Sequence, residues 1–270
     1  HRFDGYSYKT YRVDNNRNSI HSNLIIAIDE DSKGNIWIGT YGKGVCKLNP
    51  ETDELTSYEN VNNDPDGLPN DITSLIIDDK DFLWTANWFG ICRIKFDAAM
   101  NNVTQFNRIP ISVRNRNNNY AIKTIFQDKN NNIWVGSNLF TLRLKNPYSQ
   151  PEKVEMEYYS CYSESICDFE NGILVGGYEL NAIVKNANVD TFKIHHLSSI
   201  ISGKVLYDNH KIWIGNRAGI FCLEQGESDN WETTRHLKKD FSELSLNSNI
   251  ITSITNDNVG QIWIGSRGEA

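Results

Sequence analysis

The chain has 270 residues and a formal net charge of −7, and 39% of its residues are hydrophobic, including 7 tryptophans, 12 tyrosines and 11 phenylalanines. This composition supplies a packed core and excludes an intrinsically disordered chain. A negative chain also argues against a nucleic-acid duplex as partner, because duplex binding needs a basic face to neutralise phosphates. No apolar run approaches the ~18–20 residues that a membrane-spanning helix needs.

At the N-terminus, residues 1–4 resemble the third strand of a repeating unit, and residues 6–13 resemble its outer strand. The unit itself is clearest in the first full repeat, where strands are expected at 24–30, 36–38, 45–48 and 55–58. The first three expected strands are apolar on both faces or are short, as inner strands are. In the fourth, polar and apolar residues alternate, which is typical of an edge strand. Four antiparallel strands in one unit make a propeller blade.

An apolar phrase recurs six times, as in GNIWIGT (34–40) and QIWIGSR (261–267), with the anchors Trp37, Trp84, Trp134, Leu174, Trp213 and Trp263. A period of roughly 40–50 residues with several strands per unit is typical of β-propellers. We therefore predict one all-β propeller over residues 1–270, built from four-stranded antiparallel blades, with no helix longer than about two turns. The anchor side chains are predicted to be buried between sheets.

Six blade repeats are visible, at roughly 19–60, 67–107, 119–159, 161–196, 200–236 and 246–270. The last repeat contains only two expected strands, and residues 1–13 would complete it. Two arrangements fit this pattern: a closed six-bladed ring, or part of a seven-bladed ring.

A turn aspartate precedes each anchor by five or six residues, at Asp31, Asp79, Asp128, Asp168, Asp208 and Asp257. A calcium loop would also need a downstream glutamate and helical flanks, and both are missing. Capping of the hairpin turn is therefore the expected role. The sequence has no cysteine or histidine cluster with zinc spacing, so we predict no metal and no cofactor.

The five cysteines are expected to be free. Cys46 and Cys92 occupy a position where other repeats carry Leu142 or Phe221, which indicates a packing role. Cys161 and Cys167 are predicted on one strand, roughly 20 Å apart, too far to form a disulfide.

The combined phrase over Ser19–Pro50, with Gly-Asn-Ile-Trp-Ile-Gly-Thr at its centre, resembles the two-component regulator propeller repeat. The resemblance is strong there and over Ile250–Arg267, moderate in repeats two, three and five, and poor in repeat four. WD40 repeats differ, because they end in a Trp-Asp dipeptide that this sequence lacks.

The resemblance implies a periplasmic sensor segment of an inner-membrane hybrid two-component histidine kinase of Bacteroidetes. Such a sensor detects an oligosaccharide to control glycan-utilisation genes. It implies further partners: a second propeller and an immunoglobulin-like module in the same parent chain, and a homodimer of the whole ectodomain. The kinase activity would lie outside this chain.

The loop after each tryptophan strand and the loop entering each inner strand are predicted to emerge on one face. Side chains there that suit a sugar, by ring stacking or polar contact, are Tyr41, Lys43, Asn87, Trp88, Asn138, Tyr178, Glu179, Asn216, Arg217 and Arg267. Lys43, Arg217 and Arg267 together would favour an anionic sugar.

Two alternatives stay open. A protein-interaction propeller would use the same face without a small ligand, and rim side chains would then pack against neighbours or a partner. A propeller glycosidase or lyase needs paired acids near the axis, and only Glu164 and Glu179 are isolated candidates. We predict no catalytic residue and no enzyme activity for this chain.

Overall fold

The computed structural model describes residues 1–3, 5–14, 18–60, 67–88, 90–111, 120–226, 230–239, 245–257 and 259–268. The chain divides into two compact units. Unit 1 contains His1–Gln127 and Asn146–Glu155, and unit 2 contains Asp128–Lys145 and Met156–Ala270. Each unit is described by itself.

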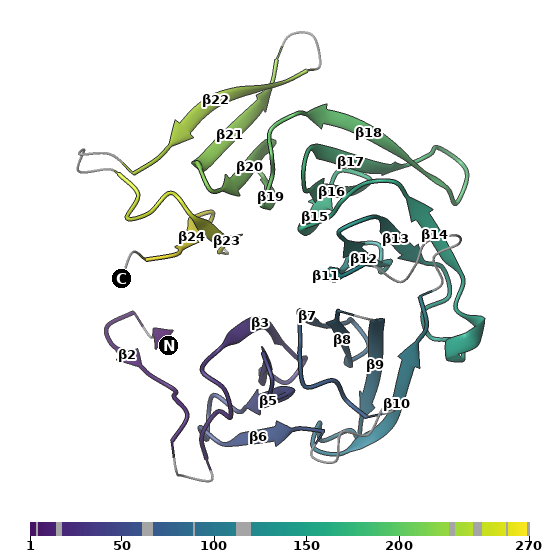
Figure 1. Ribbon diagram of the computed structural model, residues 1–270, viewed down its shortest axis with the longest axis vertical. Helices are drawn as coiled ribbons and strands as arrows, with labels where there is room; N and C mark the ends of the chain where they lie inside the picture. The colour runs from purple at the N-terminus through teal and green to yellow at the C-terminus, as the bar shows by residue number, and fades with distance from the viewer. Residues whose placement is uncertain are drawn as a thin grey trace. The chain divides into compact units, whose positions relative to one another are not determined.

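Unit 1 begins with a short hairpin and continues with two four-stranded antiparallel sheets, whose strands pair in chain order (Figure 1). The hairpin contains β1 (Arg2–Phe3) and β2 (Tyr8–Lys9). The first sheet contains β3 (Ile25–Glu30), β4 (Ile36–Thr40), β5 (Val45–Leu48) and β6 (Leu55–Tyr58). The second contains β7 (Ser74–Ile77), β8 (Phe82–Asn87), β9 (Gly90–Phe96) and β10 (Val103–Ile109). Strand β11 (Ile122–Gln127) and the 3-10 helix η1 (Pro151–Lys153) complete the unit.

Unit 2 follows the same plan. The chain passes into it within the sheet β11-β12-β13-β14, of which β12 (Ile133–Ser137), β13 (Thr141–Leu144) and β14 (Met156–Tyr159) belong to unit 2. The next two sheets contain β15 (Ser165–Phe169), β16 (Gly172–Gly176), β17 (Leu180–Lys185) and β18 (Phe192–Ser198), then β19 (Lys204–Asp208), β20 (Lys211–Asn216), β21 (Gly219–Gln225) and β22 (Trp231–Leu237). A two-stranded sheet of β23 (Ile251–Asn256) and β24 (Ile262–Ser266) ends the unit.

The fold is thus a β-propeller of four-stranded antiparallel blades, as predicted. Within the described ranges the only helix is the three-residue η1, which confirms the limit set on helix length. None of the described helical segments is long and apolar enough to cross a membrane. The N-terminal hairpin is also present, although its outer strand is limited to Tyr8–Lys9 rather than the predicted 6–13.

The anchor side chains form the cores of the blades. Trp37, Trp84, Trp134 and Leu174 are all 0% exposed. Trp134, for example, packs against Tyr159 and Phe192, with ring centroids 5.7 and 5.1 Å away. Trp213 is half-buried. The prediction of buried anchors is wrong for Trp263, which is 53% exposed because its sheet has only two strands to cover it.

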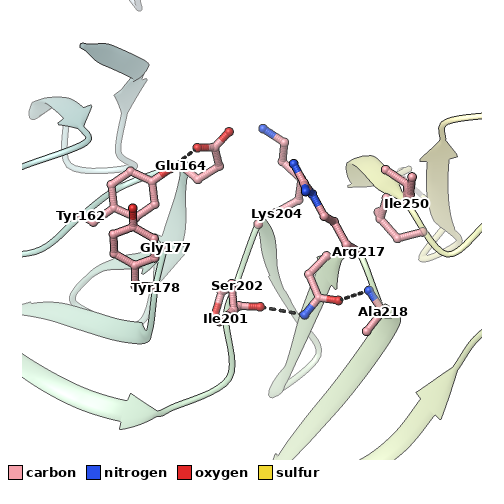
Figure 2. A pocket seen from close by; sticks show the side chains of 13 residues that line it. Tyr162, Glu164, Gly177, Tyr178, Ile201, Ser202, Lys204, Arg217, Ala218 and Ile250 are labelled. Atoms are coloured by element: carbon pink, nitrogen blue, oxygen red, sulfur yellow. Dashed lines mark hydrogen bonds between the residues drawn. The ribbon is translucent and has the colours of Figure 1, made fainter. Parts of the chain in front are cut away.

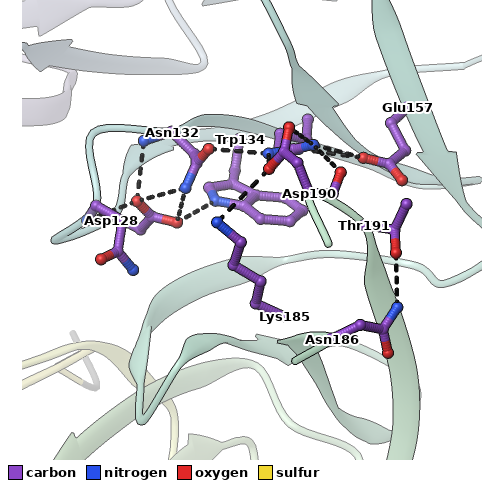
Figure 3. Close-up of polar contacts among 10 residues, drawn as sticks. Asp128, Asn132, Trp134, Glu157, Lys185, Asn186, Asp190 and Thr191 are labelled. Carbon is purple, nitrogen blue, oxygen red and sulfur yellow. Dashed lines mark hydrogen bonds and ion pairs between the residues drawn. The ribbon is translucent and has the colours of Figure 1, made fainter. Parts of the chain in front are cut away.

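In four of the repeats, an aspartate carboxylate accepts a hydrogen bond from the indole N–H of the anchor tryptophan. The donor–acceptor pairs are Trp37–Asp31 at 2.8 Å, Trp84–Asp78 at 2.7 Å, Trp134–Asp128 at 2.8 Å and Trp263–Asp257 at 2.8 Å. In all four of these repeats the same aspartate also accepts amide hydrogens of its own turn, as Asp78 does from Lys80 and Phe82. Asp128 likewise accepts from the amides of Asn130 and Asn132. Figure 3 shows Asp128 between Asn132 and Trp134. The same aspartate thus both stabilises the turn and orients the tryptophan ring.

The predicted turn aspartate is wrong in three repeats. In the second repeat Asp78 carries the role, since it stands six residues before its tryptophan, and Asp79 instead accepts from Gln127 Nε2 at 2.6 Å. Asp168 accepts from the Lys129 amide, and Asp208 accepts from Asn256 Nδ2. Asp168 and Asp208 both lie beside two-residue turns. These turns are too short to contain the loop whose backbone amides a capping carboxylate would accept.

A buried cation lies opposite each of the first three tryptophans, on the third strand of the sheet; the pairs are Trp37–Lys47, Trp84–Arg93 and Trp134–Arg143. Each cation reaches the turn between the third and fourth strands of the following sheet. Arg143, for example, donates to both carboxylate oxygens of Asp190 at 2.9 and 3.1 Å and pairs with Glu157 at 3.0 Å. These contacts tie adjacent sheets together.

All five cysteines are free thiols. Burial raises the pKa of the Cys92 thiol to about 11 and that of Cys167 to about 12, so neither is a thiolate near neutral pH. The prediction that Cys161 and Cys167 share one strand is wrong. Cys161 lies before β15, where its thiol donates to Thr141 Oγ1 at 3.3 Å.

Candidate functional site

Main-chain hydrogen bonds hold the predicted rim in place within each unit. The loop after a second strand accepts a hydrogen bond from the segment that enters the next first strand. In unit 2 the Ser163 amide donates to Ser137 O at 2.9 Å, and the Ser202 amide donates to Gly177 O at 2.8 Å. In unit 1 the Ile72 amide donates to Thr40 O at 3.0 Å. The two kinds of loop therefore emerge side by side, as predicted.

A cavity of about 540 Å³ opens among these loops in unit 2 (Figure 2). It is lined by the segments entering β15, β19 and β23 and by the loops after β16 and β20. The lining residues are Tyr162, Glu164, Gly177, Tyr178, Ile201, Ser202, Gly203, Lys204, Asn216, Arg217, Ala218, Ile250 and Ile251. Its size is within the range of small-ligand sites, which is ~300–1,000 Å³.

Two tyrosines form one wall of the cavity. Tyr162 and Tyr178 are stacked, with ring centroids 4.4 Å apart and an interplanar angle of 23°. Tyr178 is 69% exposed, so its outer ring face is available to a ligand. The Tyr162 hydroxyl donates to Glu164 Oε2 at 2.5 Å. Burial, together with this hydrogen bond, raises the pKa of Tyr162, which therefore stays a neutral donor.

A glycine permits this close packing. A Cβ at Gly177 would lie 2.3 Å from Tyr162 O and 2.7 Å from Tyr162 Cδ1. No other residue type could occupy the position without displacing the tyrosine backbone. The position of Tyr162 in the wall thus depends on the absence of a side chain at residue 177.

Two cations stand on the other side of the cavity. Lys204 begins β19, and Arg217 follows β20. Figure 2 shows both side chains pointing toward the opening that the Glu164 carboxylate also faces. Within the described residues, neither side chain forms an ion pair or a hydrogen bond. Two positive groups against one carboxylate give the lining a net charge of +1 near neutral pH.

Asn216 positions the loop that carries Arg217. Its Nδ2 donates to Ile201 O at 2.7 Å, and its Oδ1 accepts from the Ala218 amide at 2.7 Å. The side-chain amide therefore joins the segment that enters β19 to the loop that follows β20. This geometry fixes the loop and leaves Arg217 as the group that reaches outward.

Of the ten residues predicted from the sequence, the cavity brings together Tyr178, Asn216 and Arg217. Glu179 lies beside them but faces His196, 3.3 Å away. Asn138 follows β12, and Arg267 follows β24, and neither belongs to the lining.

The remaining predicted residues lie in unit 1. Tyr41 is 48% exposed, and Lys43 pairs with Glu59 at 3.6 Å. Asn87 ends β8, and the adjoining Trp88 is 38% exposed, with Lys123 Nζ 5.1 Å from its ring centroid. Phe89, also expected on this rim, lies outside the described residues.

Sequence reasoning missed several lining residues, chiefly Tyr162, Lys204, Ile201 and Ile250. All of them stand in segments that enter a first strand. The prediction that these segments share a face with the post-tryptophan loops was the signal that could have found them. Glu164 was noted as an isolated acid, and it is the only carboxylate among the described lining residues.

The fold is a β-propeller, and in unit 2 a cavity opens among its rim loops. A family model described as the two-component regulator propeller matches residues 19–42, 115–139 and 245–268. In these three segments the chain is similar to the regulator-propeller repeat. No curated protein matches the sequence.

Several solved structures share the fold. The extracellular domain of a protein described as a hybrid two-component system, BT3049 from B. thetaiotaomicron, is 21% identical with a TM-score of 0.66, over 93% of this chain and 33% of that one. Virginiamycin B lyase from Staphylococcus aureus is 13% identical with a TM-score of 0.62, over 90% and 78%. PorZ, a surface component of the type-IX secretion system of Porphyromonas gingivalis, is 14% identical with a TM-score of 0.62, over 88% and 37%.

These likenesses show the fold. The chain spans about a third of the length of the BT3049 extracellular domain, 33%.

Proposed function

We propose that this chain is the ligand-sensing part of a periplasmic sensor, that it binds an oligosaccharide at its rim and that it does not transform the ligand. The observation that carries the proposal is the cavity in unit 2, with its stacked tyrosines and its polar and charged groups. The match to the regulator-propeller model supports a place in a two-component system.

The chemistry of the lining suits a sugar. A pyranose presents a C–H face that packs on an aromatic ring, and Tyr178 offers such a ring with 69% of its surface exposed. Hydroxyl groups around the same ring need donors and acceptors, which Glu164, Lys204 and Arg217 supply. A flat apolar ligand would leave these groups desolvated without partners, at a cost.

The lining also favours binding over hydrolysis. Glycosidases generally use two carboxyl groups about 5–9.5 Å apart, and the described lining offers Glu164 alone. Virginiamycin B lyase is only 13% identical to this chain, so the likeness supports a shared fold and not a shared reaction.

Calorimetric titration with fragments chosen from a glycan array tests the proposal. Tyr178→Ala should weaken the best binder at least threefold, which is about 0.65 kcal/mol. The matched control is Tyr158→Ala, because Tyr158 is a 41% exposed tyrosine of the same unit outside the cavity. Chromatography of the ligand after incubation should recover it unchanged.

Three results would count against the proposal. Equal affinities for Tyr178→Ala and the unaltered chain would remove this cavity as the site, and released product would make the chain an enzyme. A chain that binds protein partners through this face and no sugar would be an interaction propeller.

In the parent protein, we propose that the segment belongs to the periplasmic part of an inner-membrane hybrid histidine kinase that controls glycan-utilisation genes. A second propeller, an immunoglobulin-like module and a homodimeric partner would complete it. The match to the regulator-propeller model supports this setting.

A further inference from the structure

We propose that the ligand of the unit 2 cavity carries a single acidic group, a carboxylate or a sulfate, bound by Lys204 and Arg217, next to a neutral sugar ring stacked on Tyr178. This inference rests on the proposed function, because it names the class of oligosaccharide for the same cavity. The expectation drawn from the sequence gave the positive charge to Lys43, Arg217 and Arg267; the cavity keeps Arg217 and places Lys204 beside it in the lining.

Lys204 and Arg217 line one cavity and form no ion pair with a described residue. They differ in this from Arg143 and Lys185, which both pair with Asp190, and from Lys211, which pairs with Glu224 at 3.0 Å. The positive lining is opposite in sign to the net charge of the whole chain, which is −7. Two like charges at one opening repel each other, and an anion between them removes that repulsion.

The geometry of the groups suits an oxyanion. The guanidinium of Arg217 presents a planar set of donors that matches the two oxygens of a carboxylate or sulfate, and the Lys204 ammonium adds a point charge. Asn216 fixes the loop around Arg217 by hydrogen bonds on both sides. Less conformational freedom is then lost on binding, which favours affinity.

Glu164 limits the number of acidic groups to one. Its carboxylate faces the same opening (Figure 2) and accepts a single hydrogen bond, from Tyr162. Free lone pairs on this carboxylate can accept sugar hydroxyl hydrogens, whereas a second acidic group of the ligand would be repelled. The cavity therefore selects an acidic sugar joined to a neutral one over a sugar chain that is acidic at every ring.

The test uses three matched probes with this chain: a disaccharide of one uronic acid and one neutral sugar, its methyl ester, and a disaccharide of two uronic acids. A glycan array with acidic and neutral members selects the sugar type first. The singly acidic probe should bind at least tenfold more tightly than its methyl ester, and more tightly than the doubly acidic probe.

Variants assign the effect to the two cations. Lys204→Gln and Arg217→Gln should each weaken the acidic probe at least fivefold and change binding of the methyl ester less than twofold. The matched control is Arg235→Gln, an exposed arginine of β22 outside the cavity, which should change neither. Raising the salt concentration should weaken the acidic probe alone.

The outcomes separate the two proposals. Equal affinity for the acid and its ester, or an array on which only neutral glycans bind, would overturn the acidic preference and leave oligosaccharide sensing in place. Tightest binding of the doubly acidic probe would overturn the role given to Glu164. An array on which no glycan of either kind binds would overturn both proposals.

Discussion

At the residue scale, a hydrogen bond from a tryptophan indole to an aspartate orients the side chain at the centre of a blade. Trp134 is 0% exposed, packs against Tyr159 and Phe192 and donates its N–H to Asp128. Trp263 makes the same hydrogen bond, to Asp257, but is 53% exposed. The two positions therefore share the polar contact and differ in packing alone.

This difference leads to a prediction. Trp134→Ala should lower the free energy of unfolding by ~3–5 kcal/mol, because it opens a cavity and removes the indole donor from the buried Asp128 carboxylate. Trp263→Ala should cost ~1 kcal/mol, since water already reaches most of the ring. Urea unfolding of both variants measures the two values. Similar losses would show that packing does not distinguish the two anchors.

At the element scale, buried cations join neighbouring sheets. Arg143, on β13, is buried and reaches Asp190, in the turn between β17 and β18. Its hydrogen bonds lower the pKa of the Asp190 carboxyl below the usual value. In the fourth and fifth repeats, the corresponding partners of Leu174 and Trp213 are Ala182 and Cys222, which cannot make this contact.

We predict that Arg143→Ala costs about 2–3 kcal/mol near neutral pH, less than the ~3–5 of a fully buried pair, because water screens the exposed Asp190. The matched control is Lys185→Ala, which removes an exposed partner of the same carboxylate, 3.7 Å away. It should cost well under ~1 kcal/mol.

The loss in Arg143→Ala should also depend on pH. A carboxyl whose pKa is lower in the folded than in the unfolded state stabilises the fold above the unfolded pKa, and this contribution disappears as pH falls through the folded pKa. The difference between Arg143→Ala and the unaltered chain should therefore shrink below about pH 4. Urea unfolding between pH 7 and pH 3 measures it, and a loss that grows with acidity would contradict the role of Asp190.

At the scale of the whole molecule, the number of blades depends on the last repeat. Strands β23 and β24 form a two-stranded sheet, and the hairpin β1–β2 has the order expected of a third and a fourth strand. It stays a prediction that residues 1–13 complete the repeat at 246–270. The two arrangements that fit the sequence, a six-bladed ring and part of a seven-bladed ring, both stay open.

Hydrogen exchange tests this completion. If residues 1–13 supply the missing strands, the amides of Ile262–Ser266 should exchange slowly in the full chain and at least tenfold faster after residues 1–13 are removed, because an edge strand loses its outer hydrogen bonds. The amides of β16, inside a complete sheet, serve as the internal reference. Unchanged exchange in β24 would show that another segment, or none, covers it.

The sequence predicted the fold well because tryptophan anchors and turn residues repeat with the blades. It failed where a contact depends on spacing within a turn: Asp78 and Asp79 are adjacent, and only the carboxylate six residues before Trp84 meets the indole. It also failed at Asp208, because Asn209 and His210 both adopt positive φ, of 48° and 61°, and make a tight turn without glycine.

The cavity was only partly predictable for a similar reason. Tyr178, Asn216 and Arg217 follow repeated strands and could be located by counting. Tyr162 and Lys204 lie in segments that differ from repeat to repeat, and their approach to the cavity depends on close backbone contacts at Gly177 and Gly203. Such contacts depend on how the backbone folds and cannot be read from the order of the residues.

The rim loops are joined to the following strands by main-chain atoms, as from Ser202 N to Gly177 O. Every residue except proline can make such a bond. The side chains of Tyr178 and Arg217, which are exposed, and of Lys204, which is half-buried, can therefore be exchanged without altering these main-chain hydrogen bonds. A propeller built in this way can be redesigned for a new ligand. Substitution of a few rim residues should yield a receptor for a different sugar, while the remaining residues continue to specify the same blades.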